Sequence, residues 1–125
     1  MNDHSSKDIA VEFLTLVASG RVSEAYERHV GAEFRHHNPY FIGDATSLKE
    51  AMQTNAVENP NKVLNIQRAL QDGNEVAVFS HIRQHPEDMG SAVVHIFRYE
   101  RGRIVEIWDI GQDVPENSIN ENSMF

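Results

Sequence analysis

The chain has 125 residues, of which 40% are hydrophobic, so it is long enough for one domain with a single buried core. Its net charge of −8 argues against a nucleic-acid partner, because phosphate binding needs clustered lysine and arginine. Cysteine is absent, which excludes disulfides, thiol nucleophiles and cysteine-ligated metals. The polar N-terminal residues do not resemble a secretory signal, and no stretch is apolar enough to span a bilayer. We therefore expect a cytoplasmic protein without membrane contacts.

The first part of the chain has the signals of two helices. Residues 5–18 have an apolar stripe at helical spacing; Ser5 or Ser6 can cap this helix, and Gly20 ends it. A second, short helix follows up to about His29. His4, His29 and His85 are predicted at the surface.

The middle of the chain is less regular. Residues 32–43 are predicted to form an irregular segment, which Asn38-Pro39 interrupts. Thr46 or Ser47 is the expected cap of a third helix, which ends before Pro60.

Four strand signals follow, at residues 63–71, 75–84, 91–100 and 103–110. The turn Asp72-Gly73-Asn74 joins the first two as a hairpin. Helices first and antiparallel strands afterwards indicate an α+β fold, in which N-terminal helices cover one face of a curved, mainly antiparallel sheet. The order therefore predicts a cavity between helices and sheet.

The last strand carries an acidic residue in an apolar row. Alternation puts Val105, Ile107 and Asp109 on one face, and a carboxylate there is costly unless it has a partner or a task. His81 and His95 also lie among apolar residues on their strands. The alternation of side chains allows the two histidines to face each other across neighbouring strands. Together these side chains predict an acid/base pocket.

Two segments resemble a known family. Phe34-Arg35-His36-His37-Asn38-Pro39 resembles the aromatic-x-Gln-His-Asn-Pro element of SnoaL-like polyketide cyclases, and residues 92–112 resemble the last two strands with their Glu-x-Trp-Asp-x-x-Gln element. The resemblance implies a cone-shaped α+β barrel of the nuclear transport factor 2-like superfamily, with no cofactor and a homodimer built on the sheet. It also implies that Asp109 acts as general acid/base. Departures from the family pattern are His36 in place of glutamine, His95 where aspartate is common and Phe79 where a polar residue is common.

The resemblance extends from the first helix to about Pro115, and we expect residues 1–125 to form a single SnoaL-like domain with a polar tail from about residue 112. Because the tail ends in Met124-Phe125, we expect its end to dock on the domain.

We therefore predict cofactor-free acid/base catalysis, such as aldol-type cyclisation, isomerisation or dehydration, on a small apolar carbonyl compound. The predicted catalytic residues are Asp109, His81, His95 and His37. The predicted substrate-binding residues are Asn38, Phe41, Phe79, Trp108 and Met52.

Other interpretations stay open at this stage. The same cavity could bind a small molecule without turning it over, and Asp109 could merely pair with Arg98 or with a turn. His37, His81, His95 and Asp109 are also metal-ligand types, although no tight spacing supports a metal site. His36 is predicted to face solvent, and Trp108 could anchor the core or a dimer interface.

Overall fold

The structure is a computed structural model that describes residues 5–125, so the predicted surface residue His4 lies outside the described part. In residues 5–125 the chain forms three helices and five strands. In chain order they are α1 (Ser6–Ala18), α2 (Val22–His29), β1 (Val30–His36), α3 (Ala45–Glu58), β2 (Val63–Asp72), β3 (Glu75–Arg83), β4 (Ser91–Glu100) and β5 (Arg103–Asp113).

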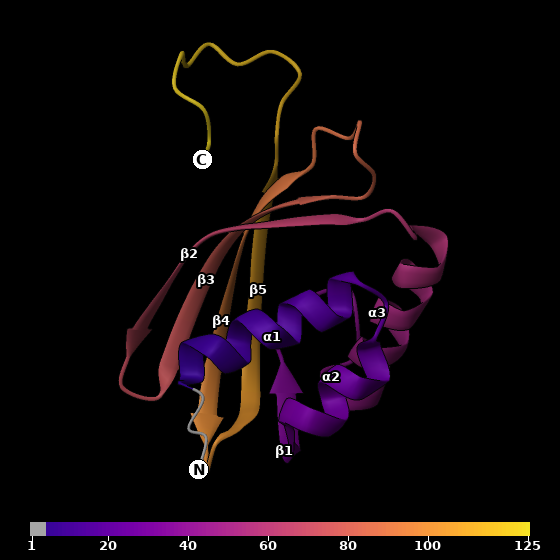
Figure 1. Cartoon of the computed structure of the whole chain (residues 1–125), viewed down its shortest axis with the longest axis vertical. Coiled ribbons are helices and arrows are strands. Elements are labelled where there is room, and N and C mark those ends of the chain that lie inside the picture. The colour runs from indigo at the N-terminus through magenta and orange to yellow at the C-terminus, as the bar shows by residue number, and fades with distance from the viewer. Residues whose placement is uncertain (1–4) are drawn as a thin grey trace.

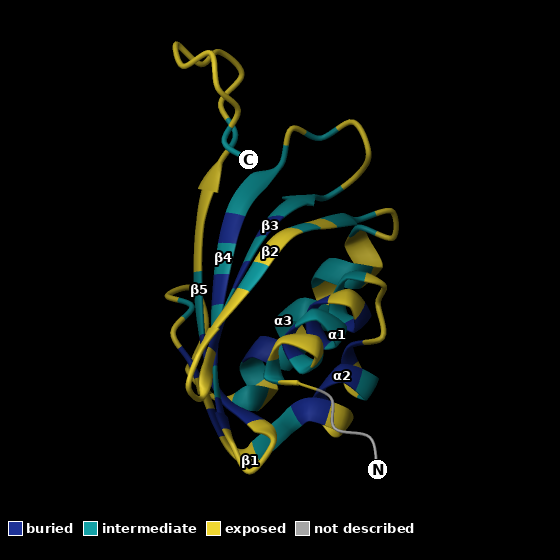
Figure 2. Ribbon diagram, turned by 60° about the vertical axis from the view of Figure 1, so that its left-hand side comes forward, coloured by how far each residue is buried: buried dark blue, intermediate teal, exposed yellow. Residues whose placement is uncertain are grey.

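The strands form one curved sheet in the order β1-β5-β4-β3-β2. β1 runs parallel to β5, and the other neighbours are antiparallel. All three helices lie against the same face, as Figures 1 and 2 show, so the sheet has an inner face toward the helices and an outer face. The predicted α+β class is confirmed, but the sheet stays open and does not close into a barrel.

The core lies between the helices and the inner face. Phe13 of α1 packs edge-on against Phe97 of β4 at 5.9 Å between ring centroids, and its ring is tilted against that of Tyr26 of α2 at 5.6 Å. Tyr26 in turn contacts Phe34 of β1. Aromatic pairs in these geometries add to the stabilisation from buried area, so this cluster fixes the helices on the sheet.

Local signals set most element ends as expected. The Ser5 hydroxyl accepts a hydrogen bond from the Asp8 backbone amide and caps α1. Gly73 has a positive φ of 61°, which the tight β2–β3 hairpin requires. The expected cap of α3 is wrong, because the carboxylate of Asp44, not Thr46 or Ser47, accepts the Ser47 amide at 2.7 Å.

Two histidine predictions are also wrong. His29 is buried and bonds Glu12 of α1 at 2.5 Å, which ties α2 to α1. His36 is buried instead of facing solvent. His85 is exposed, as predicted.

The segment 32–43 is the largest error in the predicted elements, because it contains most of β1. β1 pairs in parallel with β5, which lies about 70 residues further along the chain. A Cβ added to Gly31 would come 3.2 Å from the Val105 side chain, so the close approach of the two strands favours glycine. Non-local parallel pairing of this kind leaves no local sequence signal.

The faces of β5 differ from strict alternation. Ile104 pairs with Tyr99 and Glu106 with Arg98 on β4, so Val105 forms a bulge. Ile104 is consequently part of the core, although alternation puts it on the face opposite Asp109. Beyond the bulge the alternation holds, with Asp109 inside and Trp108 outside.

The C-terminal tail leaves the end of β5 and turns back toward the sheet (Figure 1). The Phe125 ring stacks on His81 at 4.1 Å and on Phe79 at 5.8 Å between ring centroids. The predicted docking of the chain end is thereby confirmed. β5 extends to Asp113, so the tail begins slightly later than predicted.

Within residues 5–125, no helix is long and apolar enough to cross a membrane.

Candidate functional site

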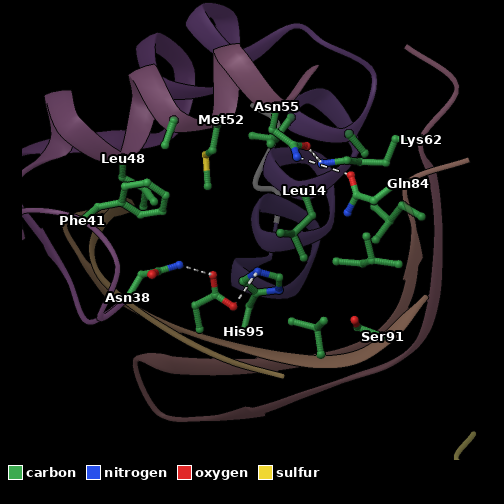
Figure 3. Close-up of a pocket in the computed structure, with 17 residues that line it drawn as sticks. Leu14, Asn38, Phe41, Leu48, Met52, Asn55, Lys62, Gln84, Ser91 and His95 are labelled. Atoms are coloured by element: carbon green, nitrogen blue, oxygen red, sulfur yellow. Dashed lines mark hydrogen bonds and ion pairs between the residues drawn. The ribbon is translucent and has the colours of Figure 1, made fainter. Parts of the chain in front are cut away.

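A cavity of about 310 Å³ lies between the helices and the inner face of the sheet. α1, α3 and the strands β2, β3 and β4 supply a mainly apolar wall (Figure 3). The apolar side chains of this wall include Leu14, Val17, Leu48, Met52, Leu64 and Val93. A volume of this size suits a small molecule, and few polar groups reach it.

One polar group of the cavity is centred on Asp109. The Asn38 side-chain amide donates a hydrogen bond to Oδ2 of Asp109 at 3.1 Å. Nε2 of His95 lies 3.7 Å from the other oxygen, Oδ1, which is beyond hydrogen-bond distance. Asp109 and His95 face each other directly on β5 and β4. One carboxylate oxygen is therefore held by an amide, and Oδ1 stays available toward the cavity.

The orientation of Asn38 is fixed by its other contacts. Its Oδ1 accepts a hydrogen bond from the backbone amide of Tyr40 at 3.0 Å, so its NH₂ group must point toward Asp109. Its own backbone amide donates to Nδ1 of His36 at 3.1 Å, and Nε2 of His36 donates to the Ile42 carbonyl at 2.7 Å. His36 thus holds the turn after β1, a role for which the sequence carries no signal.

His95 is buried, and its Nδ1 has no hydrogen-bond partner within the described residues. Burial lowers the pKa of His95, because the charged imidazolium is poorly solvated there. The negative charge of Asp109 acts in the opposite direction, and the positive charge of Lys62 adds to the lowering. His95 is consequently a neutral imidazole near neutral pH, able to donate or accept a proton.

Of the predicted site residues, Asp109, His95, Asn38, Phe41 and Met52 line this cavity together. Met52 also accepts a hydrogen bond at its sulfur from the Tyr26 hydroxyl. The other four predicted residues lie elsewhere.

His37 and Trp108 lie on the outer side of β5. Their rings stack at 4.8 Å with an interplanar angle of 4°, and Nε2 of His37 donates to Glu106 at 2.5 Å. Arg98 pairs with Glu106 and Glu100 instead of Asp109. The interpretation of Asp109 as the partner of Arg98 is thus wrong.

The expectation that His81 and His95 meet is wrong. On β3 and β4, His95 lies opposite Val78, whereas His81 lies opposite Ala92. Val78 is buried in the core, so His81 and Phe79 point to the outer face. There Nε2 of His81 donates to the Met89 carbonyl at 2.8 Å, and both rings stack on Phe125.

Because His37 and His81 are on the other face, the four residues considered as metal ligands do not form one set. Over residues 5–125, no group of three or more histidine, aspartate or glutamate side chains is placed to hold a metal ion.

Neither a protein-family model nor a curated protein matches this sequence. Solved structures do match its fold. An NTF2-like protein of unknown function from Cytophaga hutchinsonii has a TM-score of 0.71 at 14% identity, over 89% of this chain and 93% of that one. A proposed polyketide cyclase from Acidithiobacillus ferrooxidans has a TM-score of 0.69 at 19% identity, over 90% and 92%. A proposed hydroxylase from Streptomyces galilaeus has a TM-score of 0.71 at 17% identity, over 85% and 87%.

The chain has the NTF2-like fold. The fold expected from the sequence, with its cavity between helices and sheet, is thereby confirmed.

A second polar group in the NTF2-like cavity had no signal in the sequence. Lys62, Asn55 and Gln84 gather away from Asn38 and His95 in Figure 3. Lys62 directly precedes β2, and its ammonium donates to Oδ1 of Asn55. The Asn55 amide donates to Oε1 of Gln84 at 3.3 Å. A lysine after a Pro-Asn turn is usually a surface residue, so only the packing of α3 on the sheet reveals this position.

Proposed function

We propose that this protein is a SnoaL-like acid/base catalyst that needs no cofactor and acts on a small carbonyl compound with an apolar body. The observation that carries the proposal is the Asp109 carboxylate in a mainly apolar cavity, with Oδ2 held by Asn38 and Oδ1 open beside a neutral His95. One hydrogen bond from a neutral amide orients this base, and no ion pair within residues 5–125 lowers its basicity.

In the proposed reaction, Oδ1 of Asp109 removes a proton from the carbon next to the substrate carbonyl. The electron pair of the broken C–H bond moves onto the carbonyl oxygen and forms an enolate. The second N–H of the Asn38 amide and the His95 imidazole are the donors that can stabilise this oxygen. The enolate carbon then attacks a second carbonyl in cyclisation, or takes the proton back at another carbon in isomerisation.

The first proton transfer can be tested without knowing the natural substrate. Exchange of the acidic C–H protons of 2-tetralone and acetophenone is followed by ¹H NMR in D₂O. We expect the protein to accelerate exchange and Asp109→Asn to lower the acceleration by roughly 100-fold or more. Asp72→Asn, at an exposed hairpin turn that tolerates asparagine, is the matched control and should exchange at the original rate.

Equal exchange by the original protein and Asp109→Asn would refute the assignment of the base. If the ketones bind, as seen by chemical-shift changes of cavity residues, but no exchange is accelerated, the non-catalytic binding module is the better description. That alternative is supported by the mainly apolar cavity between the helices and the sheet, and it needs no base.

We also propose a homodimer through the outer face of the sheet. Ile110 on β5 is 62% exposed there, next to the half-buried Trp108. Exposed apolar side chains on a sheet face favour association with a second copy. Sedimentation velocity should show a dimer for the original protein and a monomer for Ile110→Glu; a monomer for both refutes the proposal.

A further inference from the structure

The polar group around Lys62 suggests what the ligand carries at its far end. The Lys62 ammonium lines the same cavity as Asp109 and is half-buried. Its hydrogen-bond partner is the neutral Asn55 amide, and no carboxylate in residues 5–125 forms an ion pair with it. A cation in this setting lacks the counter-charge that buried lysines usually have.

Burial is costly for this ammonium. It lowers the pKa of Lys62, because the charged form loses solvation without gaining an opposite charge. Asn55 takes one of the three N–H groups and is itself held by Gln84. Two N–H groups are thus left for a partner that enters the cavity.

The charged residues that line the cavity indicate how much charge the group bound by Lys62 carries. Lys62 is the only lysine or arginine among its lining residues, and Asp109 is the only acidic one. A single cation matches a monoanion better than a phosphate, which carries more charge and usually takes several donors or arginine. In Figure 3 the apolar side chain of Leu14 lies between Lys62 and the end of the cavity with Asn38 and His95. The shape therefore fits a molecule with an acidic group, an apolar body and a reactive carbonyl.

We propose that Lys62 binds a carboxylate of the substrate, which makes the substrate class a small keto acid with an apolar body. This inference rests on the proposed function for the role of the ketone at Asp109. Lys62, His95 and Asp109 all line the same cavity, so one ligand can contact both ends. Binding of the carboxylate supplies the missing counter-charge and anchors the carbonyl at the other end.

Two isosteric probes test the inference: 4-oxo-4-phenylbutanoate and its neutral amide, 4-oxo-4-phenylbutanamide. Their affinities are measured by NMR titration up to the solubility of each compound, at neutral pH. We expect the acid to bind roughly tenfold more tightly than the amide, as is typical of a hydrogen bond between charged groups. Lys62→Met, which keeps the apolar stem, should abolish this preference, and Lys62→Arg should keep most of it.

Equal binding of acid and amide by the original protein overturns the inference, and so does binding of neither. A preference that persists in folded Lys62→Met overturns it as well, because another group would then hold the carboxylate. If Lys62→Met fails to fold, the loss or retention of the preference in Lys62→Gln decides instead.

The same samples separate this inference from the proposed function. Deuterium exchange at the carbon next to the ketone of the bound acid reports on Asp109, whereas the acid-to-amide ratio reports on Lys62. Asp109→Asn should lose exchange and keep the preference for the acid. A preference without any exchange in the original protein would support the carboxylate site and refute the catalytic proposal.

Discussion

Two of the carboxylates on β5, Glu106 and Asp109, are three residues apart and lie in different environments on the two faces of the sheet. On the outer face, Glu106 is buried and accepts hydrogen bonds from Arg35 and Arg98 at 2.9 Å and from His37 at 2.5 Å. On the inner face, Asp109 has one neutral donor, Asn38, and an oxygen open to the cavity. Glu106, whose oxygens are already held by several donors, suits a structural role. Asp109, which has one oxygen without a donor among the described residues, suits a role as catalytic base.

The pKa of Glu106 shows how strongly its partners act. Burial by itself raises this pKa, but the hydrogen bonds and charges of His37, Arg35 and Arg98 outweigh burial and lower it to about 2. A carboxylate so firmly ionised is a poor base. Burial alone therefore does not identify a catalytic carboxylate. The number of hydrogen-bond donors that already hold the carboxylate has to be counted as well.

The largest effect on stability is expected when the outer carboxylate is removed. Glu106→Gln leaves Arg35, Arg98 and His37 without their shared charge, and should lower the free energy of unfolding by about 3 kcal/mol. Glu100→Gln removes an exposed partner of Arg98 and should cost below about 1 kcal/mol. Urea unfolding measures both. Similar losses in the two variants would show that the Glu106 cluster is no more than a surface ion pair.

The next effect concerns His36, which holds the turn that carries Asn38, the hydrogen-bond donor of Asp109. His36→Leu leaves the Asn38 amide and the Ile42 carbonyl without their partner, which should cost about 2 kcal/mol. His36→Gln, which can restore one of the two bonds, should cost about half as much. Hydrogen exchange at the Asn38 amide should accelerate in His36→Leu. Unchanged protection of that amide would mean that His36 does not hold the turn.

Glu106 on the outer face and His95 on the inner face should affect the free energy of unfolding in different pH ranges. The lowered pKa of Glu106 gives stability that is complete above its ordinary value of 4.5 and is lost as the pH falls toward about 2. The lowered pKa of His95 acts at higher pH. Below its ordinary value of 6.5 the unfolded chain binds a proton that folded His95 resists, so stability falls from there downward.

His95→Gln should consequently flatten the decline of stability between pH 6.5 and 5, by at most about 1.4 kcal/mol per pH unit. Glu106→Gln should leave that range unchanged and flatten the decline below pH 4.5. Urea unfolding across the pH range measures both slopes. A His95→Gln slope equal to that of the original protein would show that His95 is protonated equally easily in both states.

The sequence was sufficient wherever the deciding interaction is local. Ser5 caps α1 through the amide three residues later, and the Gly73-Asn74 turn fixes the hairpin. Alternation placed Asp109 on the same face as Ile107, and both lie on the inner face, although the sequence did not show which face lines the cavity. The long strands were predictable for the same reason, since each hairpin aligns neighbours along the chain.

Errors arose where distant segments decide the outcome. β1 depends on parallel pairing with β5, and the faces of His81 and His95 depend on the register across the polar β3–β4 connection. His36 and Lys62 look like ordinary polar residues in the sequence. Their burial results from the packing of the turn after β1 and of α3 on the sheet, which no spacing rule encodes.

The smallest predicted effect tests whether the outer face is covered by the chain itself. Phe125→Ala removes the ring stacked on His81 and Phe79, and should lower the free energy of unfolding by about 0.5 to 1 kcal/mol. Ile119→Ala is the matched control, because Ile119 is fully exposed in the same tail and should change nothing measurable.

NMR gives this last prediction a second measure. The ring current of Phe125 shifts the imidazole signals of His81, and Phe125→Ala should move them toward the values of a free histidine, whereas Ile119→Ala should not. Identical His81 signals in all three proteins would mean that the tail does not dock.

A docked tail would occupy part of the outer face beside β3, so a second copy of the chain would have to pack nearer β5, at Trp108 and Ile110. Loss of Phe125 should then leave dimerisation intact while Ile110→Glu abolishes it, which separates the two apolar areas of the outer face.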